Sequence, residues 1–138
     1  MLKQIKTDFY TLIKELGYNI TDNGDYVDNF PWLMLRTNGY QTNQSVNALT
    51  ATAILVLDIF STYSGEKEII EIAENINTNL YELYQKNYDL LFCRQKDLKI
   101  LDDNTTGPVR KHGVAIYEFL LGGGIASVKE VPDVEPEI

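Results

Sequence analysis

The sequence is poor in cysteine and histidine. Its 138 residues include one cysteine, Cys93, and one histidine, His112. A single cysteine excludes an internal disulfide framework. One histidine, without a Cys/His cluster around it, excludes a multi-histidine metal site. Cys93 ends the apolar run Leu-Leu-Phe-Cys, where a buried structural thiol is expected. We expect no metal and no cofactor.

Long apolar segments and an excess of positive charge are also missing. No stretch reaches the roughly 20 apolar residues that a bilayer helix needs, and the first residues lack the apolar core of a signal peptide. With 12 basic and 20 acidic residues, the formal net charge is −8. Such a surface repels phosphate backbones. We therefore expect no membrane and no direct, sequence-specific binding of nucleic acid. We also expect synthesis in the cytosol.

The chain length and the order of predicted elements indicate one α+β domain, over residues 1–126. Apolar periodicity predicts helices over 2–16, ended by Gly17, and over 65–86, with Ser64 as N-cap. Alternation predicts strands at 30–36, 49–60, 88–95, 98–101 and 112–121, and a short edge strand around 26–27. The predicted fold is a mainly antiparallel sheet with two principal helices packed on it.

Polar and turn-forming residues separate these elements. Residues 38–47 predict a long hairpin loop, and residues 102–108 a turn-rich loop. Residues 127–138 combine two prolines with four acidic side chains, a composition typical of a flexible tail.

The carboxylates are the first candidates for chemistry. Asp58 ends an apolar strand just before a helix, where several folds present ligands, and Asp102-Asp103 begins a loop. A small metal-dependent enzyme would need these carboxylates to converge in one pocket. The ligand period of a calcium loop and the spacings of a phosphate-binding loop or a nucleophile elbow are absent. We therefore favour a structural role for Asp58 and expect no catalytic, metal-binding or cofactor-binding residues.

The aromatic residues indicate a role in binding other proteins. Many of the Tyr and Trp side chains lie in or beside predicted loops, and these residue types are enriched at protein interfaces. The alternative, that these aromatic side chains lie at the edge of the core of a small domain, stays open.

Two segments resemble a known family. The strand ending Leu57-Asp58-Ile59-Phe60-Ser61 runs through Tyr63-Ser64-Gly65 into the helix that begins Glu66-Lys67-Glu68-Ile69, and Lys111-His112-Gly113-Val114 opens the last strand. Both segments resemble the tail-terminator or tail-completion proteins of long-tailed bacteriophages. The amino-terminal helix and the chain length agree, so the resemblance spans roughly residues 2–121. The polar segment 38–48 and the acidic tail depart from it.

The resemblance implies a non-enzymatic phage or prophage structural protein. Such proteins cap the head-proximal end of the tail tube, stop its growth and join the tail to the head, commonly as a six-fold ring. The implied partners are further copies of the chain, the tail tube protein and a head-completion or connector protein. The implied location is the virion tail, after assembly in the bacterial cytoplasm.

A closed ring uses two different patches of each subunit. The segments 38–47 and 102–111 are the expected patches. The candidate interface residues are Trp32, Tyr40, Gln41, Asn43, Tyr63, Asp102, Asp103, Arg110 and Lys111.

Three alternatives stay open. One is a head-completion or neck adaptor, which differs in its partner. Another is the small metal-dependent enzyme built on Asp58 and Asp102/Asp103. The third is a bacterial adaptor or immunity-type protein whose acidic surface masks a basic partner.

Overall fold

The computed structural model describes residues 1–22, 29–44, 49–87, 89–104 and 107–122. These residues form three helices and five strands, in the order α1 (Leu2–Glu15), β1 (Asn19–Thr21), β2 (Trp32–Gln44), β3 (Leu49–Ser61), α2 (Lys67–Asn79), α3 (Glu82–Lys86), β4 (Leu90–Asp102) and β5 (Lys111–Leu121). The α+β class is confirmed. The acidic segment 127–138 lies outside the described residues.

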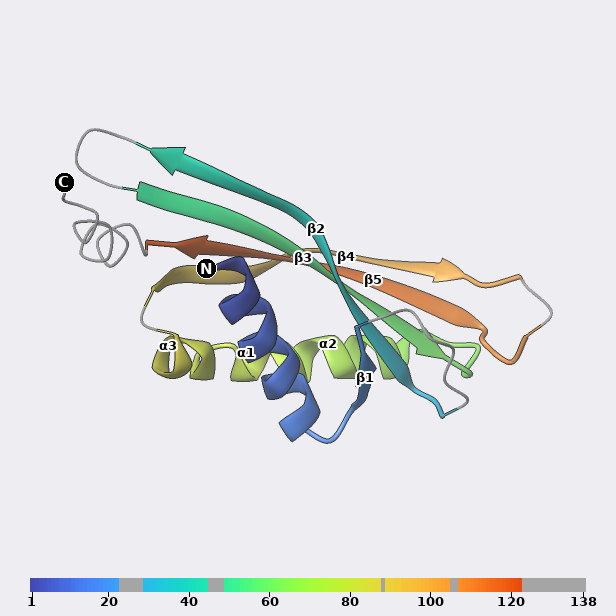
Figure 1. Cartoon of the computed structure of the whole chain (residues 1–138). Helices are drawn as coiled ribbons and strands as arrows, with labels where there is room; N and C mark the ends of the chain where they lie inside the picture. The colour runs from blue at the N-terminus through green and yellow to red at the C-terminus, as the bar shows by residue number, and fades with distance from the viewer. Residues whose placement is uncertain (23–28, 45–48, 88, 105–106, 123–138) are drawn as a thin grey trace, which may run out of the picture.

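The five strands form one sheet in the order β1-β2-β3-β5-β4. The short β1 pairs with β2 in parallel, and every other neighbouring pair is antiparallel. β3 is central: it pairs with β2 on one side and with β5 on the other. All three helices lie on the same side of this sheet (Figure 1).

The core lies between the sheet and the helices. Every second residue of β3, from Ala51 to Ile59, is fully buried, as the alternation in the sequence predicts. Phe9 of α1 packs against Tyr117 and Phe119 of β5, with ring centroids 4.9 and 5.3 Å apart. The small side chains of Ala51 and Ala53 leave room for the helices to approach β3 closely.

The first helix ends where the sequence indicates. Gly17 adopts a left-handed backbone with φ of +99°, and its N–H donates to the carbonyl of Lys14. Glycine reaches this conformation without the cost that a Cβ imposes. The strand that follows is β1, at residues 19–21, whereas the edge strand predicted around 26–27 falls outside the described residues.

The prediction of one helix over 65–86 was wrong in two respects. The chain forms α2 and α3, separated at Leu80 and Tyr81. Near this break the Asn79 side chain donates to the carbonyl of Asn75, and such side-chain bonds compete with the helical ladder. The apolar spacing continues across the break, since Leu80 and Leu83 are both buried.

The helix start was also misplaced. The N-cap position of α2 is Glu66, and no side chain caps it. The predicted cap, Ser64, is exposed. Instead, Ser61 at the end of β3 donates through Oγ to Glu68 at 2.6 Å. This contact ties the strand to the first turn of α2.

Two strand predictions were too short. The predicted loop 38–47 is strand up to Gln44, because β2 continues past a register shift between Thr37 and Gly39. The polar side chains in this part of β2 are compatible with a strand, because water surrounds the end of the hairpin. The separate strands 88–95 and 98–101 form the single strand β4, in which a shift between Gln95 and Asp97 accommodates the polar residues.

Candidate interaction surface

The side of the sheet opposite the helices is not covered by any described element (Figure 1). We call it the open face and define it by the residues that the register places there. They are Trp32, Met34, Arg36, Gly39, Gln41 and Asn43 of β2; Thr50, Thr52, Ile54, Val56, Asp58 and Phe60 of β3; His112, Val114, Ile116, Glu118 and Leu120 of β5; and Phe92, Arg94, Asp97, Lys99 and Leu101 of β4.

Apolar side chains form much of the open face. On β3 and β5, Ile54, Val114, Ile116 and Leu120 are partly exposed, and Val56 between them is buried. On the outer strand β4, Phe92 is 45% exposed and Leu101 is 50% exposed. A sheet with one solvated face usually alternates apolar and polar residues. The apolar positions on both faces of β3 and β5 indicate a sheet that something further covers.

A row of stacked rings crosses one end of the open face. Trp32 stacks on Phe60 at 4.8 Å between ring centroids, and Phe60 stacks on His112 at 4.6 Å. The register places these residues directly opposite one another on three neighbouring strands. The Trp32 indole N–H donates to Thr21 Oγ1 at 2.9 Å, which also fixes β1 to the sheet. The stack therefore joins strands from both ends of the chain.

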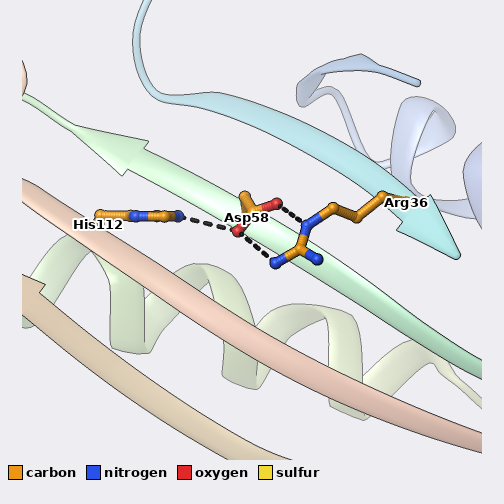
Figure 2. Close-up of polar contacts among 3 residues, drawn as sticks. All are labelled: Arg36, Asp58 and His112. Atoms are coloured by element: carbon orange, nitrogen blue, oxygen red, sulfur yellow. Dashed lines mark hydrogen bonds and ion pairs between the residues drawn. The ribbon is translucent and has the colours of Figure 1, made fainter. Parts of the chain in front are cut away.

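A charged cluster of Arg36, Asp58 and His112, drawn in Figure 2, shares His112 with the ring stack. Arg36 Nε donates to Asp58 Oδ2 at 2.7 Å, and His112 Nε2 lies 2.9 Å from Asp58 Oδ1. The Asp58 side chain is 3% exposed, whereas the Arg36 side chain is 48% exposed. Both carboxylate oxygens are satisfied, and the outer part of the guanidinium still reaches solvent.

The two partners keep Asp58 ionised. Burial alone would raise the pKa of this carboxyl, but the hydrogen bonds from His112 and Arg36 outweigh burial and lower its pKa. The hydrogen bond to Asp58 also raises the pKa of Arg36. The cluster is therefore a stable, internally compensated set of charges at neutral pH.

The structure distributes the candidate interface residues over several places. Trp32 lies in the ring stack and is 7% exposed, while Tyr63 is 64% exposed in the turn before α2. Tyr40, Gln41 and Asn43 are exposed at the far end of β2.

The remaining four lie at the turn between β4 and β5. Asp102 pairs with Lys111, and the Asp103 N–H donates to the Arg110 carbonyl at 3.0 Å. Arg110 in turn donates its N–H to Ser61 of β3. These contacts hold the 102–111 hairpin against the end of β3.

The sheet does not bring the candidate acidic residues together. Asp58 belongs to the open face, whereas Asp102 lies opposite Lys111, which lies opposite Ser61 on the helix side. The part of the chain that the structure describes contains no group of three or more His, Cys, Asp or Glu side chains arranged to hold a metal ion. Cys93 lies on the helix side, partly buried against the core, and burial raises the pKa of its thiol.

Sequence reasoning missed the partners of Asp58. Arg36 and His112 are 22 residues before it and 54 residues after it. Only the pairing of β2 and β5 on the two sides of β3 brings them together. The signal that could have been used is alternation: Arg36 and His112 lie in phase with the apolar open-face residues of their own strands.

Comparisons with known proteins do not place the chain in a family: no protein-family model and no curated protein matches it. Among the described helices, none has the length and apolar character needed to cross a bilayer.

Proposed function

We propose that this protein is a non-enzymatic structural subunit of the tail-terminator type, which caps the head-proximal end of a phage tail tube and joins the tail to the head. In this role it acts in the virion tail, as a homo-hexameric ring between the tail tube protein and a head-completion or connector protein.

One observation carries the proposal. The two segments that resemble the tail-terminator family, 56–76 and 111–119, are far apart in the sequence but are direct neighbours in the sheet. Phe60 lies opposite His112, and Asp58 contacts His112 across the same pair of strands. The resemblance therefore concerns one continuous structural unit.

The chemistry of that unit supports a structural role. Asp58 contacts Arg36 and His112 through both carboxylate oxygens, so its strongest interactions are internal. Ser61 and Glu68 bond to each other at the strand-to-helix corner. The residues that define the motif thus hold β3, β5 and α2 in one geometry.

The open face supports a role in assembly. A sheet face with this many apolar side chains resembles the surfaces that proteins use to bind partners. A ring subunit needs such surfaces, because it must contact two neighbours as well as the tube and the connector.

Two measurements test the proposal. Native mass spectrometry over a concentration series should show a hexamer whose share grows with concentration. The purified chain should also bind one end of tubes assembled from the tail tube protein of the same phage, and electron microscopy should show that these ends stop growing. A stable dimer that leaves tube growth unchanged at both ends would refute the proposed function.

A further inference from the structure

We propose that the open face binds a second copy of this chain. The inference rests on the proposed function in that the open face would be one of the two patches through which each subunit contacts its neighbours in the ring. It makes a separate claim, however, because the chain could self-associate through this face without acting on a phage tail.

The size of the open face favours a second copy of the chain as its partner. Four strands spaced about 4.8 Å apart, paired over about nine residues of about 3.3 Å each, give a face of roughly 600 Å². A stable protein–protein interface buries about 800 Å² on each partner. The open face therefore provides most of the area needed.

The charge of the open face also favours a second copy. The chain carries a formal net charge of −8, so two copies repel each other over most of their surfaces. On the open face the register places three basic residues, Arg36, Arg94 and Lys99, and three acidic residues, Asp58, Asp97 and Glu118, so the formal charges cancel. Copies of this acidic protein meet with least repulsion on this face. A strongly basic partner would favour the acidic surfaces elsewhere.

Four of the six charged side chains on this face are already paired. Arg36 contacts Asp58 at 2.7 Å, and Arg94 contacts Glu118 at 3.0 Å on neighbouring strands. An interface that covers them does not leave an unpaired buried charge, which would be costly. The guanidinium of Arg36 still has unbonded N–H groups at its exposed end, and these can orient the incoming copy.

A pair of matched substitutions tests the apolar part of the face. Ile116→Asp places a charge in the centre of the open face, and Ile70→Asp makes the same change on α2, at an isoleucine of the same intermediate exposure. In sedimentation equilibrium of the full chain, we expect Ile116→Asp to raise the self-association Kd by at least about tenfold. We expect Ile70→Asp to stay within about twofold of the unmodified chain.

A second pair keeps the test valid if Ile116→Asp prevents folding. Lys99→Glu makes the open face acidic, and Lys67→Glu makes the same change at the start of α2; both lysines are exposed. We expect Lys99→Glu to raise the Kd by roughly threefold to tenfold, with a stronger effect at low salt. Lys67→Glu should leave the Kd within about twofold of its original value.

The outcomes separate the two proposals. If hexamers form and neither open-face substitution weakens them, the open face is not the interface, while the tail role survives. If the open-face substitutions weaken self-association but the chain does not cap tubes, this inference holds and the tail role fails. A chain that stays monomeric at every concentration overturns the inference, including the case in which its own residues 123–138 occupy the face.

Discussion

Asp58→Asn is the substitution that most directly probes the charged cluster on the open face. Asparagine has nearly the same shape, but it carries no charge, and one of its two terminal groups is an NH₂ donor. Asp58 accepts a hydrogen bond from Arg36 Nε at Oδ2 and one from His112 at Oδ1, where Arg36 Nη2 also donates at 3.5 Å. In the variant, one of these donors faces another donor, so at least one hydrogen bond is lost.

The geometry sets the size of the effect. A hydrogen bond that involves a charged group contributes about 1.5–3 kcal/mol. The Asp58 side chain is 3% exposed, so water cannot replace a lost partner there, whereas the 48% exposed Arg36 side chain regains hydration. We therefore expect Asp58→Asn to lower the free energy of unfolding by about 2–3 kcal/mol at neutral pH. For a domain of this length, the midpoint of thermal unfolding should fall by about 8 °C.

The loss should depend on pH. Because the pKa of Asp58 is lower in the folded state than its ordinary value, ionised Asp58 stabilises the fold fully above the unfolded-state pKa. This contribution disappears as the pH falls through the folded-state pKa. The difference between the original chain and Asp58→Asn should therefore be largest near neutral pH and shrink below about pH 4.

Urea unfolding followed by tryptophan fluorescence provides the assay, because Trp32 is the single tryptophan and is buried in the adjacent ring stack. Far-UV circular dichroism serves as a second probe, since the substitution lies near the indole. The matched control is Asp102→Asn, which removes the carboxylate of a pair in which Asp102 is 70% exposed. It should change stability much less, because water screens that pair. Equal losses for the two variants, or a loss at Asp58 that does not diminish in acid, would refute the reasoning.

Three further substitutions test the core. Phe9→Ala removes a fully buried ring that packs on two aromatic rings of β5 and should cost about 3–5 kcal/mol in urea unfolding; a loss below about 1 kcal/mol would contradict this packing. Gly113→Ala places a Cβ 2.6 Å from Ile69 Cγ2 and should cost about 1–3 kcal/mol, whereas Gly65→Ala, with no atom within 4 Å, should not; similar losses at both glycines would argue against the clash. Burial raises the pKa of Tyr117, so its hydroxyl stays uncharged at neutral pH. This hydroxyl donates one long hydrogen bond, of 3.4 Å, to Gln95, so Tyr117→Phe should lower the free energy of unfolding by less than about 1 kcal/mol. A larger loss in thermal unfolding would show that this hydrogen bond contributes more than its length suggests.

The fold could be predicted where the chain follows a simple period. The stripe on α1, its end at Gly17 and the alternation of β3 all specify their elements locally, and each is confirmed. The wrong predictions concern segments whose polar composition does not indicate their secondary structure. The polar residues of the β2–β3 hairpin indicate a loop, but strand pairing continues through them. The Asn- and Thr-rich end of α2 gives little warning of the break before α3.

The candidate site was harder to predict because its residues are far apart in the sequence. The sequence predicts a structural role for Asp58 near a strand end, but its two partners lie on strands that only the sheet order makes adjacent. Periodicity reports which face a residue takes, but it does not report which strands are neighbours. The tail-terminator reading therefore depends on motif residues, while the open face becomes visible only in the assembled sheet.

The order of the strands also bears on how this chain folds. β2 and β3 form one antiparallel pair close in sequence, and β4 and β5 form another. The sheet becomes complete only when β3 meets β5, with α2 and α3 lying between them in the chain. Contacts of this kind close a long loop and slow folding. We expect the two hairpins to form early and the β3–β5 junction late, so that Asp58 and His112 acquire their contact near the end of the reaction. A newly made chain would then expose its sheet edges until this junction closes.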